Sequence, residues 1–394
     1  MNKSTLTISG VIISMAGLAI FSCDNQNNKS AEPTADISFK TSPLKTGNGP
    51  GSIETADFNK DGLADMVIAN ATDGTLSVFL NDGKGKFVHA AGSPFSANKF
   101  PNDIAITDVN NDGIPDLCIA NTEASLLSVF IGNGKGQFRQ AAGSPFPVHA
   151  KPHTHGIAAA DFNADGNIDL ATDDWGENKI VVLYGDGKGH FASETFFSVG
   201  KRPYQRLRSA DINRDGKPDI VTTNLEGNNA TVLIGQGDGK FVEAPGSPFS
   251  CGAAPFGVSI GDVNGDGTMD LAIVNSPTIT AESRGSDGLW ILSGDGKGGF
   301  LTLPGSPFKT GKSPSRVAIG DLDDDGINDI AVTNYNDKSI SLFFMSKNGV
   351  RKTQTISAGQ RPDGIAIKDI NGDRKADILV CNFDDNTVLI LTSK

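Results

Sequence analysis

The sequence predicts an all-β fold, a seven-bladed β-propeller of four-stranded antiparallel blades. Three observations lead to this prediction. An acidic nine-residue motif occurs seven times, with its first residues 48 to 59 positions apart. Each repeat contains short apolar runs separated by Gly, Asn, Asp and Pro turns. An orphan strand precedes the first repeat, and the last repeat lacks its fourth strand.

The N-terminus has the features of an export signal. A basic start at Lys3 is followed by an apolar stretch, Leu6 to Phe21, that is short and Ser/Gly-rich for a membrane span. The stretch ends at Ser22-Cys23 and resembles the bacterial lipobox, whose Cys is lipidated and becomes the mature N-terminus. Phe21 departs from the residue usual there, so ordinary cleavage nearby is the alternative.

The resulting domain organisation has three parts. We predict a signal peptide over residues 1–22, a flexible polar tether over 23–35 that begins with lipidated Cys23, and the propeller over 36–394. The protein would be exported to the bacterial cell envelope. Its contact with the membrane would be through the lipid anchor only.

Charge and cysteine content exclude other classes. A formal net charge of -12 and a pI near 4.9 argue against a nucleic-acid partner, which requires a basic face. Apart from Cys23, the cysteines are Cys118, Cys251 and Cys381, whose spacing gives no disulfide framework. Cys118 and Cys381 lie in apolar strand runs and are predicted to be small core residues.

The elements follow the same order in every repeat. A first run rich in Ala and Gly leads into the acidic loop, and a second run follows it. The third run ends in a Gly-Lys-Gly turn, and a fourth strand often leads to Gly-Ser-Pro-Phe. Small first strands suit the crowded axis of a propeller, and a linear solenoid is the alternative. If residues 37–47 supply the missing strand of the last repeat, the ring closes without sheet edges, so the termini favour the propeller.

The acidic loops have the spacing of calcium sites. Side-chain oxygens at positions 1, 3, 5 and 9 and a carbonyl at 7 give a hard cation an all-oxygen shell, and Gly at position 6 permits a left-handed turn. We expect up to seven structural Ca²⁺ ions; the alternative is that the loops only cap turns. Arg374 replaces this Gly in the seventh loop, so we expect the weakest or an empty site there. The side-chain ligands would be Asp57, Asn59, Asp61, Asp65; Asp108, Asn110, Asp112, Asp116; Asp161, Asn163, Asp165, Asp169; Asp211, Asn213, Asp215, Asp219; Asp262, Asn264, Asp266, Asp270; Asp321, Asp323, Asp325, Asp329; and Asp369, Asn371, Asp373, Asp377.

These loops and the Gly-Lys-Gly-Phe turns resemble the FG-GAP or VCBS repeat family, which includes the propellers of integrin α-subunits. The resemblance covers residues 37–394 and is specific for fold rather than function. It implies that the calcium loops join first and second strands on a lower face, and that ligands approach the opposite, upper face. It also implies these carbonyl donors: Leu63, Ile114, Asn167, Lys217, Thr268, Ile327 and Lys375.

Function is expected in the upper-face loops, which vary between repeats. Aromatic residues beside polar groups there would suit a sugar or a peptide, although rim residues of this kind are commonly just solvated. The His153-x-His155 pair lacks the further ligands of a transition-metal site. The candidate ligand contacts are His153, His155, Trp175, Tyr204, Arg206, Phe256, Arg316, Tyr335, Asp363 and Phe383.

The sequence therefore predicts a monomeric, calcium-stabilised recognition domain that binds a protein or a glycan through its upper face. No catalytic residue is predicted, because the Ser/His/Asp elbow, phosphate loop and dinucleotide fingerprint are all absent from the sequence. One alternative is a lectin with repeated sugar pockets between blades. The other is a polysaccharide lyase or hydrolase that uses His153, His155, Tyr204 and Arg206.

Overall fold

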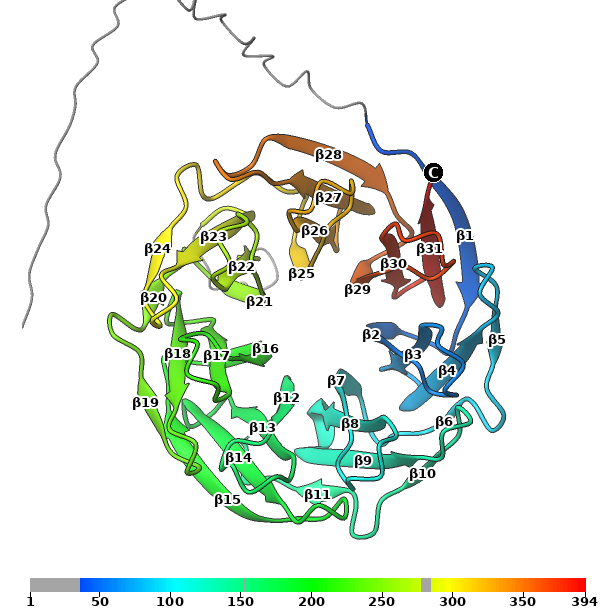
Figure 1. Cartoon of the computed structure of the whole chain (residues 1–394), viewed down its shortest axis with the longest axis vertical. Helices are drawn as coiled ribbons and strands as arrows, with labels where there is room; N and C mark the ends of the chain where they lie inside the picture. Colours follow the sequence, from blue (N-terminus) through cyan, green and yellow to red (C-terminus); the bar gives the residue numbers. More distant parts are fainter. Residues whose placement is uncertain (1–35, 152, 278–284) are drawn as a thin grey trace, which may run out of the picture. The chain divides into compact units, whose positions relative to one another are not determined.

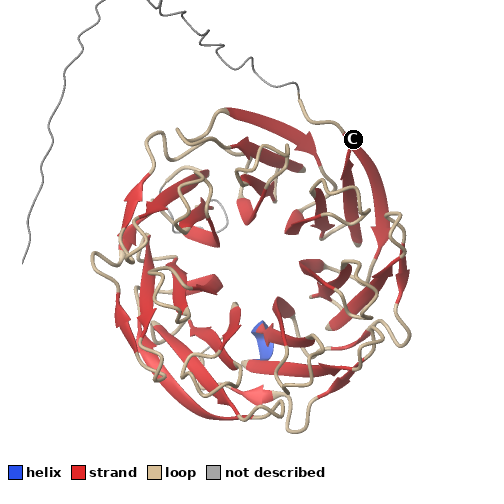
Figure 2. Ribbon diagram, in the orientation of Figure 1, coloured by secondary structure: helices blue, strands red, loops and turns tan. Residues whose placement is uncertain are grey.

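The computed structural model describes residues 36–151, 153–277 and 285–394. The predicted signal peptide, tether and lipidated Cys23 lie outside these residues. The part of the chain from Asp36 onward forms one compact unit, a ring of seven antiparallel sheets around a central channel (Figures 1 and 2). The predicted all-β propeller is confirmed. Within the described ranges the helical structure is the single turn η1 (Thr122–Ala124), and no helix there is long and apolar enough to cross a membrane.

The strands of blades one to four run outward from the channel in chain order. Blade one has β2 (Pro50–Ala56), β3 (Asp65–Asn70), β4 (Thr75–Asn81) and β5 (Phe87–His89), with β6 (Phe95–Ser96) on β4. Blade two has β7 (Pro101–Thr107), β8 (Asp116–Asn121), β9 (Leu126–Gly132) and β10 (Phe138–Gln140), with β11 (Phe146–Pro147) on β9. Blade three has β12 (Ile157–Ala160), β13 (Asp169–Asp174), β14 (Lys179–Gly185) and β15 (Phe191–Ser198). Blade four has β16 (Pro203–Ala210), β17 (Asp219–Asn224), β18 (Asn229–Gly235) and β19 (Phe241–Glu243), with β20 (Phe249–Ser250) on β18.

The remaining three blades complete the ring. Blade five has β21 (Pro255–Gly261), β22 (Asp270–Asn275), β23 (Gly288–Gly294) and β24 (Phe300–Thr302). Blade six has β25 (Pro314–Gly320), β26 (Asp329–Asn334), β27 (Ser339–Phe344) and β28 (Lys352–Ser357). Blade seven has β29 (Pro362–Lys368), β30 (Asp377–Asn382), β31 (Thr387–Ser393) and, outermost, the N-terminal β1 (Phe39–Lys45).

The two ends of the described ring meet in blade seven, as the sequence predicted. β1 pairs antiparallel with β31 along its whole length, from Phe39 opposite Ser393 to Lys45 opposite Thr387 (Figure 1). The outermost strand of the last blade therefore comes from the opposite end of the chain. This pairing closes the ring and leaves β31 without an open edge.

The hydrophobic core is divided into layers between neighbouring blades. One layer packs Val129 and Cys118 of blade two against Leu170 and Val181 of blade three, and all four are fully buried. An equivalent layer joins blade one to blade seven and includes Cys381, so the first and last repeats share a core. Cys118, Cys251 and Cys381 are all buried and free, as small core residues.

The recurrent Gly-Ser-Pro-Phe segment completes the third strand of its blade. The hydroxyl of Ser93 accepts a hydrogen bond of 2.8 Å from the backbone N–H of Val78 on β4. Ser144, Ser247 and Ser306 accept the equivalent bonds in blades two, four and five. A side chain thus satisfies a strand N–H where the short fourth strand has ended.

The Gly-Lys-Gly turn connects one blade to the next. The N–H of Gly136 donates to the carbonyl of Phe58 in the preceding blade, at 2.9 Å. The φ of Gly136 is +74°, a left-handed conformation that favours glycine, and an added Cβ would lie 2.6 Å from Leu80 Cδ2, so the leucine side chain would have to move.

Candidate functional site

The seven acidic loops all lie at one end of the ring, between the first and second strand of each blade. In the first loop, Asp57 accepts hydrogen bonds from the N–H groups of Asp61 (3.1 Å) and Gly62 (2.8 Å). Asn59 Oδ1 accepts from Asp61 N, and Asp61 Oδ1 accepts from Leu63 N. Each carboxylate oxygen keeps lone pairs beyond these bonds, so the wrapped loop is compatible with an oxygen-coordinated cation.

The ninth residue of each loop is buried and holds its blade together. Asp65 Oδ2 accepts from Phe58 N at 3.0 Å, and Asp65 Oδ1 accepts from Asn81 N at the end of β4, at 2.8 Å. The same pair of bonds recurs in every blade, so this carboxylate joins the loop to the third strand. Burial raises the pKa of Asp65, Asp116, Asp169 and Asp270 to about 6 and that of Asp329 to about 7. Carboxylates of the same loop add to this rise, while the backbone N–H donors oppose it.

In the sixth loop, one arginine side chain lies against two of the carboxylates. Among the described residues, the three acidic side chains whose ligand atoms lie within 4.8 Å of one another are Asp321, Asp323 and Asp325. The Arg351 guanidinium contacts Asp323 and lies 3.1 Å from Asp325 Oδ2. This arrangement shows that the loop carboxylates converge on a positive charge, which fits the donor chemistry of a hard cation.

The seventh loop keeps the geometry of the others in spite of Arg374. The residue has φ +70°, the left-handed conformation of Gly62 and its counterparts. Its N–H donates to Asp369 Oδ2 at 2.8 Å, as Gly62 N donates to Asp57. A Cβ at Gly62 would meet no atom within 4 Å, so the turn has room for a side chain and only backbone strain opposes it.

At the opposite end of the ring, blades three to five bring together five of the predicted contacts. The ring of His155 contacts that of Tyr204 in a tilted arrangement, with 4.2 Å between the centroids, and the centroids of Tyr204 and Phe256 are 5.4 Å apart. His153 and Trp175 lie 6.2 Å apart and both contact His155. These five residues are the aromatic crescent. Phe256 and His155 are buried within it, while the other three are half-buried.

Two polar atoms of the aromatic crescent are buried without a hydrogen-bond partner among the described residues. They are Trp175 Nε1 and His153 Nδ1. The Arg202 guanidinium lies 3.8 Å above the Trp175 ring, which orients the indole. Buried polar atoms that have no partner are costly in the free protein and become favourable contacts when a polar ligand binds.

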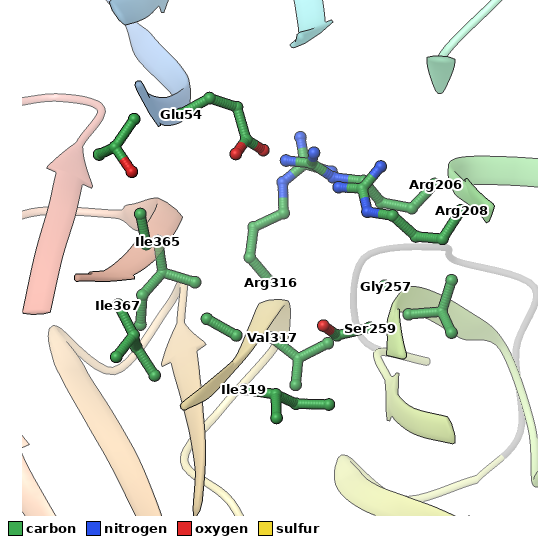
Figure 3. Close-up of a pocket in the computed structure, with 14 residues that line it drawn as sticks. Glu54, Arg206, Arg208, Gly257, Ser259, Arg316, Val317, Ile319, Ile365 and Ile367 are labelled. Atoms are coloured by element: carbon green, nitrogen blue, oxygen red, sulfur yellow. The ribbon is translucent and has the colours of Figure 1, made fainter. Parts of the chain in front are cut away.

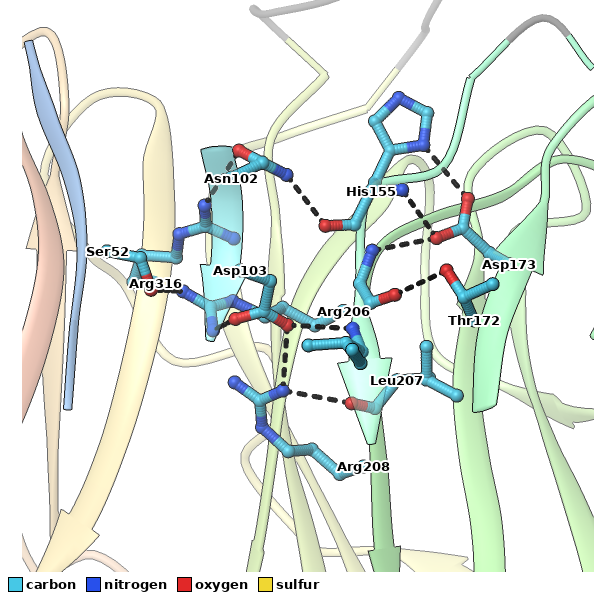
Figure 4. A network of polar contacts seen from close by, with 12 residues as sticks. Ser52, Asn102, Asp103, His155, Thr172, Asp173, Arg206, Leu207, Arg208 and Arg316 are labelled. Carbon is cyan, nitrogen blue, oxygen red and sulfur yellow. Dashed lines mark hydrogen bonds and ion pairs between the residues drawn. The ribbon is translucent and has the colours of Figure 1, made fainter. Parts of the chain in front are cut away.

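His155 is held by an aspartate. Its Nδ1 lies 2.9 Å from Asp173 Oδ2, and the N–H groups of His155 and Gly156 both donate to Asp173 Oδ1 (Figure 4). An ionised carboxylate only accepts, so Nδ1 carries the proton of a neutral ring and Nε2 is left as the acceptor. Figure 4 shows that the second ring nitrogen points away from Asp173.

The other predicted contacts do not join the aromatic crescent. Arg206 and Arg316 lie inside the channel and are buried, with relative exposures of 6% and 3%. Asp363 lies 3.2 Å from Arg316 Nε. Tyr335 is half-buried in blade six, with Arg361 5.3 Å from its ring centroid, and Phe383 is half-buried in blade seven. The predicted contacts are therefore divided into the aromatic crescent, a channel cluster that includes Arg206, Arg316 and Asp363, and two separate aromatic residues, Tyr335 and Phe383.

Sequence reasoning missed the channel partners of these arginines. Asp103 on β7 contacts Arg206 and accepts from Arg208 Nη1 at 3.1 Å (Figure 4). Burial would raise the pKa of Asp103, but three arginines together hold it below the ordinary value. One feature of the sequence could have indicated these contacts. Charged residues such as Glu54 and Arg208 occur in first strands that otherwise contain small or aliphatic residues.

The pattern of FG-GAP-like repeats matches residues 57–119, 108–172, 211–273 and 321–380, which is more than half of the chain. This chain belongs to the FG-GAP-like repeat family. Each of the four matched segments of this FG-GAP-like propeller begins at the first Asp of an acidic loop. No curated protein matches the sequence.

Solved structures share the fold of this FG-GAP-like propeller at low sequence identity. BBS1N, in complex with ARL6DN, has a TM-score of 0.60 and 11% identity, covering 91% of this chain and 97% of that chain. A catalytically inactive virginiamycin B lyase from Staphylococcus aureus, crystallised with quinupristin, has a TM-score of 0.57 and 16% identity, covering 90% and 99%. Kuenenia stuttgartiensis hydrazine synthase has a TM-score of 0.60 and 14% identity, covering 89% and 97%. These similarities concern the fold and span enzymes as well as a binding protein.

Proposed function

We propose that this propeller is a calcium-stabilised recognition module of the bacterial envelope that binds a glycan through the aromatic crescent. The single observation that favours this is the pair of buried, unpartnered polar atoms, Trp175 Nε1 and His153 Nδ1, on half-buried rings of the aromatic crescent. Sugars offer an apolar ring face for stacking and hydroxyl groups for such atoms. A protein ligand, the alternative, would engage the same surface over a wider area.

The proposal includes calcium in the acidic loops. Each loop would bind the ion through the side chains at positions 1, 3, 5 and 9 and the carbonyl at position 7. The ion would supply positive charge that offsets the repulsion between loop carboxylates, and so would act structurally. The Asp side chains also hold the loop by accepting its backbone N–H bonds, and the ninth residue joins the loop to the third strand of the blade.

The test compares rim variants on a glycan array in buffer with millimolar calcium. We expect Trp175→Ala to weaken binding about tenfold or more, because a stacking surface and a donor are both lost. Tyr335→Ala is the matched control, since it removes another half-buried rim aromatic next to an arginine. Equal binding by wild type and Trp175→Ala, or loss only in Tyr335→Ala, would contradict the proposal.

A second candidate, a lyase or hydrolase, is favoured by the His155–Asp173 pair. With Nδ1 held by Asp173, Nε2 is available to accept a proton, and the ring of Tyr204 lies beside it. Polysaccharides would be incubated with the protein and followed for new reducing ends or unsaturated products. Turnover that disappears in His155→Ala would establish this function; its absence across substrates that bind would leave recognition as the function.

Localisation and assembly complete the proposal. We propose export, lipidation at Cys23, membrane attachment through the lipid only, and a monomeric propeller. Mass spectrometry of the mature N-terminus should find a lipidated Cys23. Cys23→Ala should release the protein into the soluble envelope fraction, and continued membrane attachment of this variant would argue against the anchor.

A further inference from the structure

The central channel contains a cluster of charged side chains that neither the family nor the aromatic crescent explains. Every described inner strand is the last strand of its sheet on the channel side, so its channel edge has no strand partner. Arg206 and Arg208 reach the channel from β16, Arg316 from β25 and Glu54 from β2 (Figure 3). Three blades thus direct charged groups toward one place.

The carboxylates of this cluster do not satisfy its guanidinium groups. Asp103 already accepts from Arg206, Arg208 and the N–H of Ile157, so most of its acceptor capacity is used. Burial raises the pKa of Glu54 although Arg208 and Arg206 oppose the rise. Burial, and then Arg316, lower the pKa of Arg206 to about 9, so Arg206 remains charged at neutral pH.

Arg316 is the guanidinium group of this cluster that lacks some of its hydrogen-bond acceptors within the described part of the chain. Its side chain is 3% exposed, and neither Nε nor Nη1 has a hydrogen-bond partner among the described residues. Nε lies 3.2 Å from Asp363 Oδ1 without the alignment of a hydrogen bond, and Nη2 reaches Asn102 Oδ1 only at 3.5 Å. A buried guanidinium with open donors is strongly unfavourable unless an anion occupies the space beside it.

That space exists. A cavity of about 220 Å³ is lined by Arg206, Arg208, Arg316 and Glu54 on one side, and by the inner strands β21, β25 and β29 on the other (Figure 3). The cavity is smaller than the roughly 300–1,000 Å³ of pockets for drug-sized ligands, which limits the ligand to a single small molecule.

We propose that the channel binds a small hydroxylated carboxylate, the chemistry of a sugar acid, with its carboxylate on Arg316 and Arg208. Guanidinium groups bind carboxylates through paired, charge-assisted hydrogen bonds. Ser259, Thr55 and the unpaired edges of β21, β25 and β29 supply donors and acceptors for hydroxyl groups on the far side. None of the residues that line the cavity belongs to the aromatic crescent, and the site requires no polymer, so it is independent of the rim proposal.

The experiment measures binding of glucuronate to the full propeller by calorimetry, with glucose and inorganic phosphate as comparison ligands. We expect saturable one-to-one binding of glucuronate, with a dissociation constant in the millimolar range or lower. The affinities for glucose and for phosphate should be lower by at least about tenfold. Glucose lacks the charge and phosphate lacks the hydroxylated body. No binding of glucuronate, or equal binding of either comparison ligand, would overturn the proposal.

Two channel variants and one control test the residues. Arg316→Gln should weaken glucuronate binding about tenfold or more, because it removes the open guanidinium. Glu54→Gln should tighten binding several-fold, since it removes a competing carboxylate and keeps the shape. Arg139→Gln changes the same charge on the exposed face of β10 and should leave binding unchanged. If Arg316→Gln unfolds, Glu54→Gln decides alone: unchanged or weaker binding would refute the site, whatever the rim variants do.

Discussion

At the residue scale, Arg374 shows how a site can depart from its motif and keep its shape. The motif requires a left-handed residue, and Arg374 adopts φ +70° and donates the same backbone hydrogen bond as the glycine of other loops. Non-glycine residues in this region cost about 1–2 kcal/mol. The substitution therefore affects the strain of the loop rather than its ligand geometry, and the predicted weakening of the seventh calcium site remains a prediction.

Replacing Arg374 by glycine should remove this strain. We expect Arg374→Gly to raise the free energy of unfolding by about 0.5–1 kcal/mol, because the relief of strain exceeds the entropy that glycine adds to the unfolded chain. Urea unfolding in calcium-free buffer measures the change. Arg374→Ala is the control, since alanine is also strained at φ +70°. Equal stabilisation by both variants would show that the arginine side chain, rather than the backbone conformation, destabilises the loop.

At the element scale, the acidic loop and its blade were predictable, and the contacts between separate elements were not. The loops, the strand order and the small inner strands each follow from a pattern that is local in sequence and repeated seven times. The contacts of Arg206 with Asp103 and of Arg351 with Asp323 join residues 103 and 28 positions apart. Such contacts depend on the register of separate elements, which no single repeat specifies.

Calcium removal tests the loops as elements. At millimolar calcium, each occupied loop should add about 1 kcal/mol to the stability, because extracellular calcium modules bind at about 0.1–1 mM. Chelation should therefore lower the melting temperature by several degrees, and added calcium should restore it. A melting temperature that is the same with calcium and with chelator would show that the loops only cap turns.

The sixth loop offers a sharper version, because Arg351 occupies its carboxylates. Arg351→Gln should tighten calcium binding several-fold, since the ion no longer competes with the guanidinium for Asp323 and Asp325. Calorimetric titration with calcium measures the affinities of the variant and of the wild type. Arg361→Gln is the control, because it removes an exposed arginine paired with Asp384 outside the acidic loops. Weaker calcium binding in Arg351→Gln would mean that the arginine orders the loop for the ion.

At the scale of the whole molecule, closure of the ring positions both candidate sites. The channel cluster draws on blades one, two, four, six and seven, so its geometry depends on every blade being held in one circle. The circle is closed by β1, whose seven residues pair with β31 and whose Leu44 packs on the core between blades one and seven. Loss of β1 would free the edge of β31 and loosen that layer.

Truncation and cross-linking test closure from both directions. Deleting residues 36–45 with the preceding segment should lower the melting temperature markedly and promote association, because β31 becomes an open edge. Deleting residues 1–35 alone is the matched control and should leave the melting temperature unchanged.

A cross-link tests closure in the opposite direction. A cysteine pair at Lys40 and Thr392, which are opposite in the register and 352 residues apart, should stabilise the oxidised protein by up to about 4–5 kcal/mol. Cys118, Cys251 and Cys381 are buried and should not compete for this bond. If the truncated protein melts like the control and stays monomeric, and oxidation of the cysteine pair changes nothing, the ring does not depend on β1 for its stability.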